Sequence, residues 1–437
     1  MIMRPSITML EQKMNTVSLY AQEEQGIARA AIQEALQHAL APVLDNLRHV
    51  LIVPPDFTRF HSNAGLITQL LYHMLVPGCH VDILPALGTH APVSREQWLS
   101  MFGDIPYEAM QVHRWREDCT PIGEVPADFV SRVSEGVMNE AIPFAINKRL
   151  LDPKYDLVLS VGQVVPHEVI GIANHSKNIF VGCGGPGIIN ATHILGAMYG
   201  MERLMGKDHS PVRKVLDYAA EHMIDAIPLN YILTVTDAPG GIIRTHGLFI
   251  GPQRSFFDKA VALTQQKNMT WLDKPLKKAV AYLDEHEFTS TWLGNKAIYR
   301  TRMAIADGGE LLVLAPGVER FGEDDTMDAL IRKYGYRGRQ YVIETLKKAK
   351  DLGQNLSAAA HLIHGSSDGR FTITYATRHL SREEVEGVGF AYMPYEEAVA
   401  RYAPAKMKDG YNLMEDGEEA YYIPNPALGL WIDKSRK

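Results

Sequence analysis

Residues 156–193 read DLVLSVGQVVPHEVIGIANHSKNIFVGCGGPGIINATH, and this stretch predicts the centre of the fold. The apolar run at 157–161 is typical of a buried strand. It leads into a loop that carries histidines, a lysine and a cluster of glycines: His167, His175, Lys177, Gly182, Gly184, Gly185, Gly187 and His193. A buried strand that ends in such a loop is the usual layout of an α/β active site.

The same order of strand, polar loop and helix occurs twice earlier in the chain. The apolar run 50–53 is followed by Asp56 and Arg59, and the run 81–84 is followed by His90. Because the carboxyl ends of parallel strands meet at one edge of a sheet, we expect all three loops to share one pocket. An arginine beside a carboxylate is typical of an anion-binding site, with a surface ion pair as the alternative.

The length of the chain predicts more than one domain. Its 437 residues are too many for a single core, so we expect an α/β protein of two α/β domains, with mostly parallel sheets and an active-site cleft between the domains. The expected parts are a catalytic, cofactor-anchoring domain at 1–265, a domain at 266–410 that closes the cleft, and a tail at 411–437 that packs back on the body. Segments 271–283 and 295–306 are predicted to contain helices, the second capped by Gly308 and Gly309.

Charge and cysteine content exclude several classes of protein. A formal net charge of -7 argues against a nucleic-acid partner, which requires a basic face, but leaves a small anionic substrate open. Three unspaced cysteines form neither a disulfide framework nor a zinc site and indicate a reducing compartment. Residues 1–26 lack the apolar core of a secretory signal, and no apolar run approaches the roughly 18 residues of a membrane span. We therefore expect a cytoplasmic protein with no membrane partner.

The titratable loop residues have both functional and structural interpretations. The histidines suit proton transfer near neutral pH or metal binding, although most of the 17 in the chain are expected to be structural. No metal motif such as HExxH is present, so a metal would need most of its ligands from something other than protein. Lys177 is either a nucleophile or covalent anchor, or a solvated lysine. The cluster GCGGPG is a tight turn or a phosphate cradle, and because it is not GxGxxG it argues against a nicotinamide dehydrogenase.

Taken together, five features of the sequence resemble the nickel-dependent lactate racemase family, and the resemblance covers most of the chain. These features are DFTR at 56–59, GTH at 88–90, PH at 166–167, Lys177 and His193. The resemblance implies a nickel-pincer nucleotide, a pyridinium mononucleotide with two sulfur arms and a nickel–carbon bond, which other proteins build and which is tethered to Lys177. It implies that His193 binds nickel. His90 and His167 would alternate as acid and base, and Arg59 would bind the substrate carboxylate. We further expect cofactor contacts from Asp56, Gly182, Gly184 and Gly185.

The implied activity is inversion at C2 of a 2-hydroxy acid. One histidine would take the hydroxyl proton while the C2 hydrogen leaves as hydride to the cofactor, and the return of hydride to the other face, with a proton from the other histidine, would complete the racemisation. A protein that keeps the fold but only binds ligand or handles cofactor is the alternative. The oligomeric state is not predicted.

Departures from the family pattern suggest a substrate other than lactate. The family has a tyrosine, a glutamine and then a lysine three residues later; here Tyr299 is kept, Arg300 stands at the glutamine position and Met303 at the lysine position, with Arg302 as a replacement cation. Asn174 and His175 stand before Lys177, where the family usually has glycines, and should add polar lining. A larger polyhydroxy or dicarboxylic acid, such as a sugar acid (an aldonate), is therefore expected.

Overall fold

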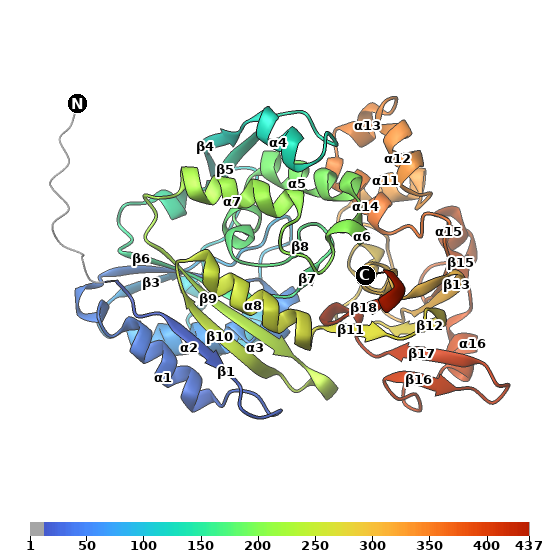
Figure 1. The fold of residues 1–437 in the computed structure, drawn as a ribbon, viewed down its shortest axis with the longest axis horizontal. Helices are drawn as coiled ribbons and strands as arrows, with labels where there is room; N and C mark the ends of the chain where they lie inside the picture. Colours follow the sequence, from blue (N-terminus) through green and yellow to red (C-terminus); the bar gives the residue numbers. More distant parts are fainter. Residues whose placement is uncertain (1–12, 437) are drawn as a thin grey trace.

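The computed structural model describes residues 13–436, in which two six-stranded sheets occupy the two halves of the molecule (Figure 1). Residues 1–12, at the start of the predicted first domain, and residue 437, the end of the predicted tail, lie outside the described residues. The α/β fold with two mostly parallel sheets is confirmed.

The first sheet is parallel except at one edge. Strands β3, β2, β6 and β9 run in the same direction, and β10 and β1 are antiparallel. In spatial order the strands are β1 (Val17–Tyr20), β10 (Arg244–Gly251), β9 (Leu229–Asp237), β6 (Leu157–Gln163), β2 (His49–Val53) and β3 (His80–Ile83). The strands predicted at 50–53, 81–84 and 157–161 are confirmed, and they are neighbours in the sheet.

Helices cover both faces of the first sheet because its central strands are apolar on both sides. In β2, Val50 and Ile52 pack into one cluster, and Leu51 and Val53 pack into another on the opposite face. The first cluster includes α1 (Arg29–Leu40), α2 (Ala64–Leu75) and α3 (Arg95–Phe102), and the second includes α5 (Pro186–Tyr199), α7 (Pro211–Met223) and α8 (Arg254–Lys267).

The second sheet is parallel except for its edge strand β16. Its order is β15 (Ala391–Tyr392), β14 (Thr372–Ala376), β13 (Ile305–Leu314), β12 (Leu276–Tyr282), β17 (Glu419–Ile423) and β16 (Gly410–Leu413). One face packs against α16 (Tyr395–Arg401), and the other packs against α10 (Lys296–Thr301), α11 (Asp325–Tyr334) and α14 (Leu356–His364). The segment after residue 410 thus supplies two strands to this sheet.

Smaller elements connect the halves and flank the site. Strands β11 (Met269–Leu272) and β18 (Leu430–Asp433) pair in parallel at the junction (Figure 1). The other strands and helices are β4 (Cys119–Val125), α4 (Ala127–Val133), β5 (Ile142–Asn147), β7 (Pro166–His167), β8 (Gly171–Ile172), α6 (Met201–Leu204), α9 (Thr291–Gly294), α12 (Arg339–Leu346), α13 (Lys350–Gly353) and α15 (Arg382–Gly387). Among residues 13–436, no helix is long and apolar enough to cross a membrane.

One helix prediction in the second half is wrong, and another is correct at its start but too long. Segment 271–283 holds the end of β11 and all of β12, because pairing with β13 and β17 overrides the helical preference of its alanines and lysines. The helix expected at 295–306 ends at Thr301 and β13 begins at Ile305. Gly308, at φ +76°, lies inside β13, where the pairing register with β12 shifts, and does not cap a helix.

Candidate active site

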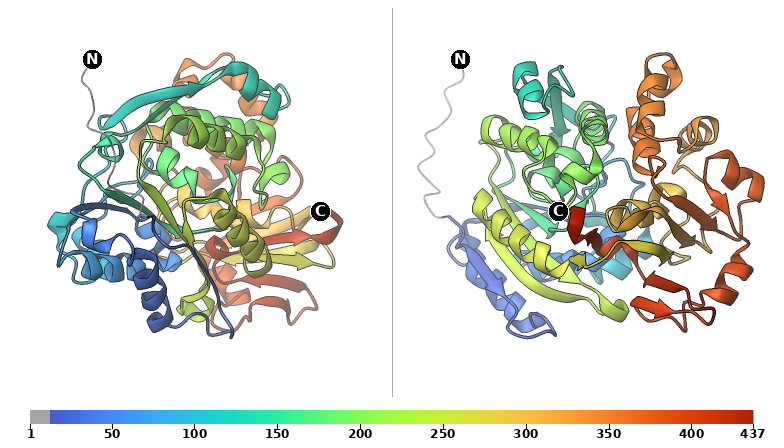
Figure 2. Two further views of the ribbon diagram at one scale, coloured as in Figure 1. Left: turned by 60° about the vertical axis from the view of Figure 1, so that its left-hand side comes forward. Right: turned by 45° about the vertical axis from the view of Figure 1, so that its right-hand side comes forward.

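One cavity lies between the two halves, whose arrangement Figure 2 shows from two sides. The first half contributes the ends of β2, β3 and β6 and the loops that follow them, and the second half contributes α9, α10 and α14. The titratable and polar lining includes Asp56, Arg59, His90, His167, Glu168, Lys177, His193, Lys296, Tyr299, Ser357, His361 and His364. The three loops that follow the strands therefore meet at one cavity.

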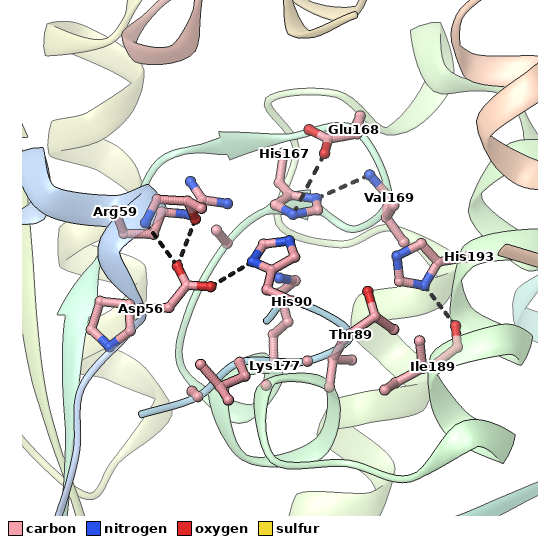
Figure 3. A pocket seen from close by; sticks show the side chains of 18 of the residues that line it. Asp56, Arg59, Thr89, His90, His167, Glu168, Val169, Lys177, Ile189 and His193 are labelled. Atoms are coloured by element: carbon pink, nitrogen blue, oxygen red, sulfur yellow. Dashed lines mark hydrogen bonds and ion pairs between the residues drawn. The ribbon is translucent and has the colours of Figure 1, made fainter. Parts of the chain in front are cut away.

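The Asp56 carboxylate holds His90 in one orientation (Figure 3). Its Oδ1 accepts hydrogen bonds from the backbone N–H and the hydroxyl of Thr58, and its Oδ2 pairs with His90 Nδ1. Burial alone would raise the pKa of Asp56, but His90 and Thr58 outweigh it and the pKa is lowered. An ionised carboxylate accepts a hydrogen bond from Nδ1–H, and in this tautomer Nε2 of the neutral His90 ring is free to act as a base. Asp56 therefore positions His90; it also lines the cavity, and the cofactor contact expected of it stays a prediction.

His167 has the opposite arrangement of hydrogen bonds. The backbone N–H of Val169 donates to its Nδ1 at 3.1 Å, so the proton of the neutral ring must be on Nε2. That Nε2 lies 3.8 Å from Glu168 Oε1 (Figure 3). Burial holds the pKa of His167 well below its usual value, although Glu168 opposes the shift. His167 is thus neutral and presents a donor, whereas His90 presents an acceptor.

The loop before Lys177 is fixed by a strained backbone and a buried arginine. Asn174 and His175 have φ of 72° and 57°, the left-handed region where the family pattern has glycines. Arg213, from α7, donates to three oxygens of the loop: Ser176 Oγ at 2.9 Å, Ile172 O at 2.8 Å and Asn174 O at 3.0 Å. Asn174 lines the cavity, but His175 stacks on Tyr231 with ring centroids 3.9 Å apart, so the expected polar lining comes from Asn174 alone.

Lys177 faces the cavity as a lysine with an unusually low pKa. Burial and the positive charge of Arg59 lower its pKa to about 8. The next residue, Asn178, ties the backbone to the sheet by donating to Val53 O and Ser160 Oγ, both at 3.0 Å. A held lysine whose neutral form is accessible near physiological pH is suited to covalent attachment.

His193 is prepared to bind a metal through one nitrogen. On α5 its Nδ1 donates to Ile189 O at 2.6 Å, which fixes the proton on Nδ1 and leaves Nε2 free (Figure 3). Burial lowers its pKa to about 4, so the ring stays neutral. No group of three His, Cys, Asp or Glu side chains within residues 13–436 could hold a metal ion. Lys177 and His193 therefore fit a metal cofactor that supplies its own remaining ligands.

The glycine cluster mainly serves packing. Gly182 lines the cavity, but Gly184 and Gly185 do not. A Cβ on Gly184 would lie 1.8 Å from the carbonyl oxygen of Phe180, and one on Gly185 would lie 3.2 Å from Cys119 Cβ. Close contacts with the preceding turn at 178–182 and with β4 account for these two glycines, and of the expected phosphate cradle only Gly182 lines the cavity.

The three second-domain residues predicted for the substrate lie in different environments. Tyr299 lines the cavity, with its hydroxyl 2.9 Å from His361 Nδ1. Arg302 is 2% exposed and does not line the cavity; it donates to Glu202 Oε1 at 2.7 Å and to Asp368 Oδ2 at 3.2 Å, so its predicted substrate contact is not supported. Arg300 is 1% exposed and does not line the cavity, although it lies close enough to Glu168 for their charges to interact. It has no hydrogen-bond partner at Nε or Nη1 among the described residues.

The sequence reasoning missed four titratable residues that line the cavity. Glu168 directly follows His167, and Lys296 lies one helical turn before Tyr299, close enough to Arg59 and Glu168 to interact with their charges. The other two, His361 and His364, stand three residues apart in the buried α14, as HLIH. The sequence signal for these two histidines was their i, i+3 spacing in an otherwise apolar helical segment, which places both side chains on the same face of the helix.

The chain is similar to one protein family and to solved structures. Residues 5–205 match the family model described as the lactate racemase N-terminal domain. A crystal structure of a protein from Thermotoga maritima is similar with a TM-score of 0.81 and 26% identity, covering 94% of this chain and 100% of that chain. The lactate racemase apoprotein from Thermoanaerobacterium thermosaccharolyticum shares the fold with a TM-score of 0.69 and 16% identity, covering 96% and 95%. No curated protein sequence has significant similarity to the chain.

Proposed function

We propose that this chain, whose residues 5–205 match the family model described as the lactate racemase N-terminal domain, is a racemase or epimerase of 2-hydroxy acids that works with a nickel-pincer nucleotide tethered to Lys177. When bound, that cofactor supplies the hydride acceptor, which no side chain can provide. Lys177 would hold it covalently and His193 Nε2 would bind its nickel.

The observation that carries the proposal is that hydrogen bonds hold the two histidines as opposite tautomers. In His90, Nδ1–H donates to Asp56, so Nε2 of the neutral ring is an acceptor. In His167, Nδ1 accepts a hydrogen bond from the N–H of Val169, so Nε2 carries the proton and is a donor. For one enantiomer, His90 takes the C2 hydroxyl proton and His167 returns a proton to that oxygen when the other enantiomer forms. The roles reverse in the opposite direction, so an inverting enzyme has a use for both states.

The charges of the cavity suit an acid with a polar chain. Arg59 and Lys296 are cations from opposite halves of the molecule and provide a site for the C2 carboxylate. Gln163, Asn174 and Ser357 add neutral polar groups to the lining. We therefore propose a larger polar 2-hydroxy acid, such as an aldonate, rather than lactate as the substrate.

The test is production of the protein together with cofactor biosynthesis proteins, followed by intact mass, nickel analysis and a panel of 2-hydroxy acids. We expect a mass gain of nucleotide size at Lys177, one nickel, and inversion at C2. Lys177→Ala is the control and should gain neither mass nor activity. An unmodified Lys177, in a host where a known family member loads, would refute the proposal. A loaded chain that inverts no 2-hydroxy acid would instead favour a binding or cofactor-handling homologue.

A further inference from the structure

We propose that Glu168 is a specificity residue whose carboxylate accepts hydrogen bonds from hydroxyl groups of the substrate beyond C2, so that the site selects polyhydroxy monocarboxylates. The inference rests on the proposed function and assigns the binding of the substrate chain to a residue that the racemase reaction itself does not require.

Glu168 has hydrogen-bonding capacity that no residue uses. It lines the cavity with its side chain 17% exposed, and its one hydrogen-bond donor among the described residues is its own backbone N–H. Burial alone would raise its pKa, but His167, Arg300 and Arg59 outweigh burial and hold the pKa well below the usual range. A buried ionised carboxylate has about four acceptor positions and is costly to leave without donors. A ligand that brings hydroxyl groups would supply them.

Two further buried groups near Glu168 are also unsatisfied. His364, on α14, is 3% exposed, lines the cavity and has no partner for Nε2 within residues 13–436. Burial lowers its pKa to about 3, so it is a neutral group that can meet a hydroxyl. Arg300 lies close enough to Glu168 to interact with its charge, but no ion pair within 4.0 Å joins these two described residues. A lactate methyl group would leave the polar atoms of Glu168 and His364 unpaired, whereas a chain of hydroxyls can both donate and accept.

The charge of Glu168 also sets the direction in which a substrate binds. A carboxylate is repelled by Glu168 and attracted by Arg59 and Lys296, so the C2 carboxylate is directed to these cations and the hydroxyl chain to Glu168. An acid with a second carboxylate at its far end would place a negative charge near Glu168. The charge of Glu168 therefore favours an aldonate over a dicarboxylic sugar acid.

The competing role for Glu168 is an electrostatic one through His167, whose Nε2 is 3.8 Å away. In such a role, replacing Glu168 would change the rate of the chemical step by the same factor for every substrate and would alter the pH profile of kcat. A role in binding hydroxyls would instead change the ratio of kcat/KM between substrates. The two roles are therefore separable by measuring a hydroxylated and a non-hydroxylated substrate with the same variants.

The experiment compares loaded wild-type, Glu168→Leu and Glu168→Gln on gluconate, glucarate and lactate. Glu287→Gln is the matched control, because Glu287 lines a neighbouring hollow and also faces Arg59 and Lys296. We expect wild type to prefer gluconate, and Glu168→Leu to lower kcat/KM for gluconate roughly 10- to 100-fold while lactate changes less than about threefold. Glu168→Gln, which keeps an acceptor, should lose less on gluconate and gain on glucarate.

Equilibrium binding of gluconate to wild type and Glu168→Leu by calorimetry provides a readout independent of turnover, and circular dichroism establishes that each variant folds. Equal losses on lactate and gluconate, or a wild-type preference for lactate or glucarate, would overturn the inference while leaving the racemase function standing. Loaded wild type that inverts none of these acids would overturn the proposed function, and the inference with it.

Discussion

The lowered pKa of Lys177 is a prediction that can be measured before any cofactor is present. The pKa falls from an ordinary value of 10.5 to about 8. At pH 7 roughly a tenth of the Lys177 amines would then be unprotonated, against about 0.03% for an ordinary lysine, a ratio of about 300. Because only the neutral amine attacks an acylating reagent, Lys177 should react far faster than its limited exposure suggests.

The assay is competitive labelling of unloaded protein with a trace of acetic anhydride between pH 6 and 11, with each lysine quantified by peptide mass spectrometry. Lys148, whose side chain is 62% exposed, is an internal reference for reagent reactivity. We expect the extent of Lys177 labelling to rise with pH and to reach half its maximum near pH 8, because the group loses its proton as pH passes the pKa.

Arg59→Gln tests the cause of this shift. Removing a like charge should move the pKa of Lys177 back toward 10.5 and slow its labelling at pH 7 by at least about threefold. Lys148 should be unaffected and serves as the control for folding and reagent quality. A midpoint at or above pH 10 in the wild type would refute the argument that burial and Arg59 prepare Lys177 for attachment.

Three further outcomes follow from the contacts. Asp56→Asn should lower kcat of the loaded enzyme on the order of 100-fold, because His90 loses the carboxylate that fixes its tautomer, with Tm unchanged within a few degrees. Gly184→Ala should destabilise the chain by about 3 kcal/mol in urea unfolding, whereas Gly353→Ala, with open space at Cβ, should be nearly neutral. Arg213→Met should cost about 3 kcal/mol and reduce cofactor loading, measured by urea unfolding and intact mass, since three loop oxygens lose their donor.

The sheet that carries the site could be predicted because its strands have strong local signals. Continuous apolar runs at 50–53 and 157–161, each followed by Pro or Gly and polar residues, correspond to strands buried on both faces. The same reasoning failed at 276–282, where LKKAVAY has the composition of a helix. This segment is a strand because it pairs with its neighbours in the sheet, and one of them, β17, begins at Glu419, more than 100 residues along the chain. The local sequence around 276–282 contains no sign of that pairing.

The chemistry of the site was less predictable than its location. Motifs identified His90 and His167, but the difference between them depends on what contacts each Nδ1, a carboxylate 34 residues away in one case and a backbone N–H in the other. For Arg302, the position in the sequence pattern led to a role that the structure does not support. Its sequence position suggested a replacement for a substrate lysine, yet its partner Glu202 comes from the other half of the chain, 100 residues away, and only the folded structure reveals that pairing.

The loop before Lys177 shows how side-chain contacts can hold non-glycine residues in the left-handed region. Non-glycine residues in the left-handed region cost roughly 1–2 kcal/mol each, so Asn174 and His175 would disfavour this turn on their own. The stack of His175 on Tyr231 and the three hydrogen bonds from Arg213 offset that strain. Side-chain contacts thus hold a turn that glycines would merely permit, and a loop held in this way keeps Lys177 directed into the cavity before any cofactor arrives.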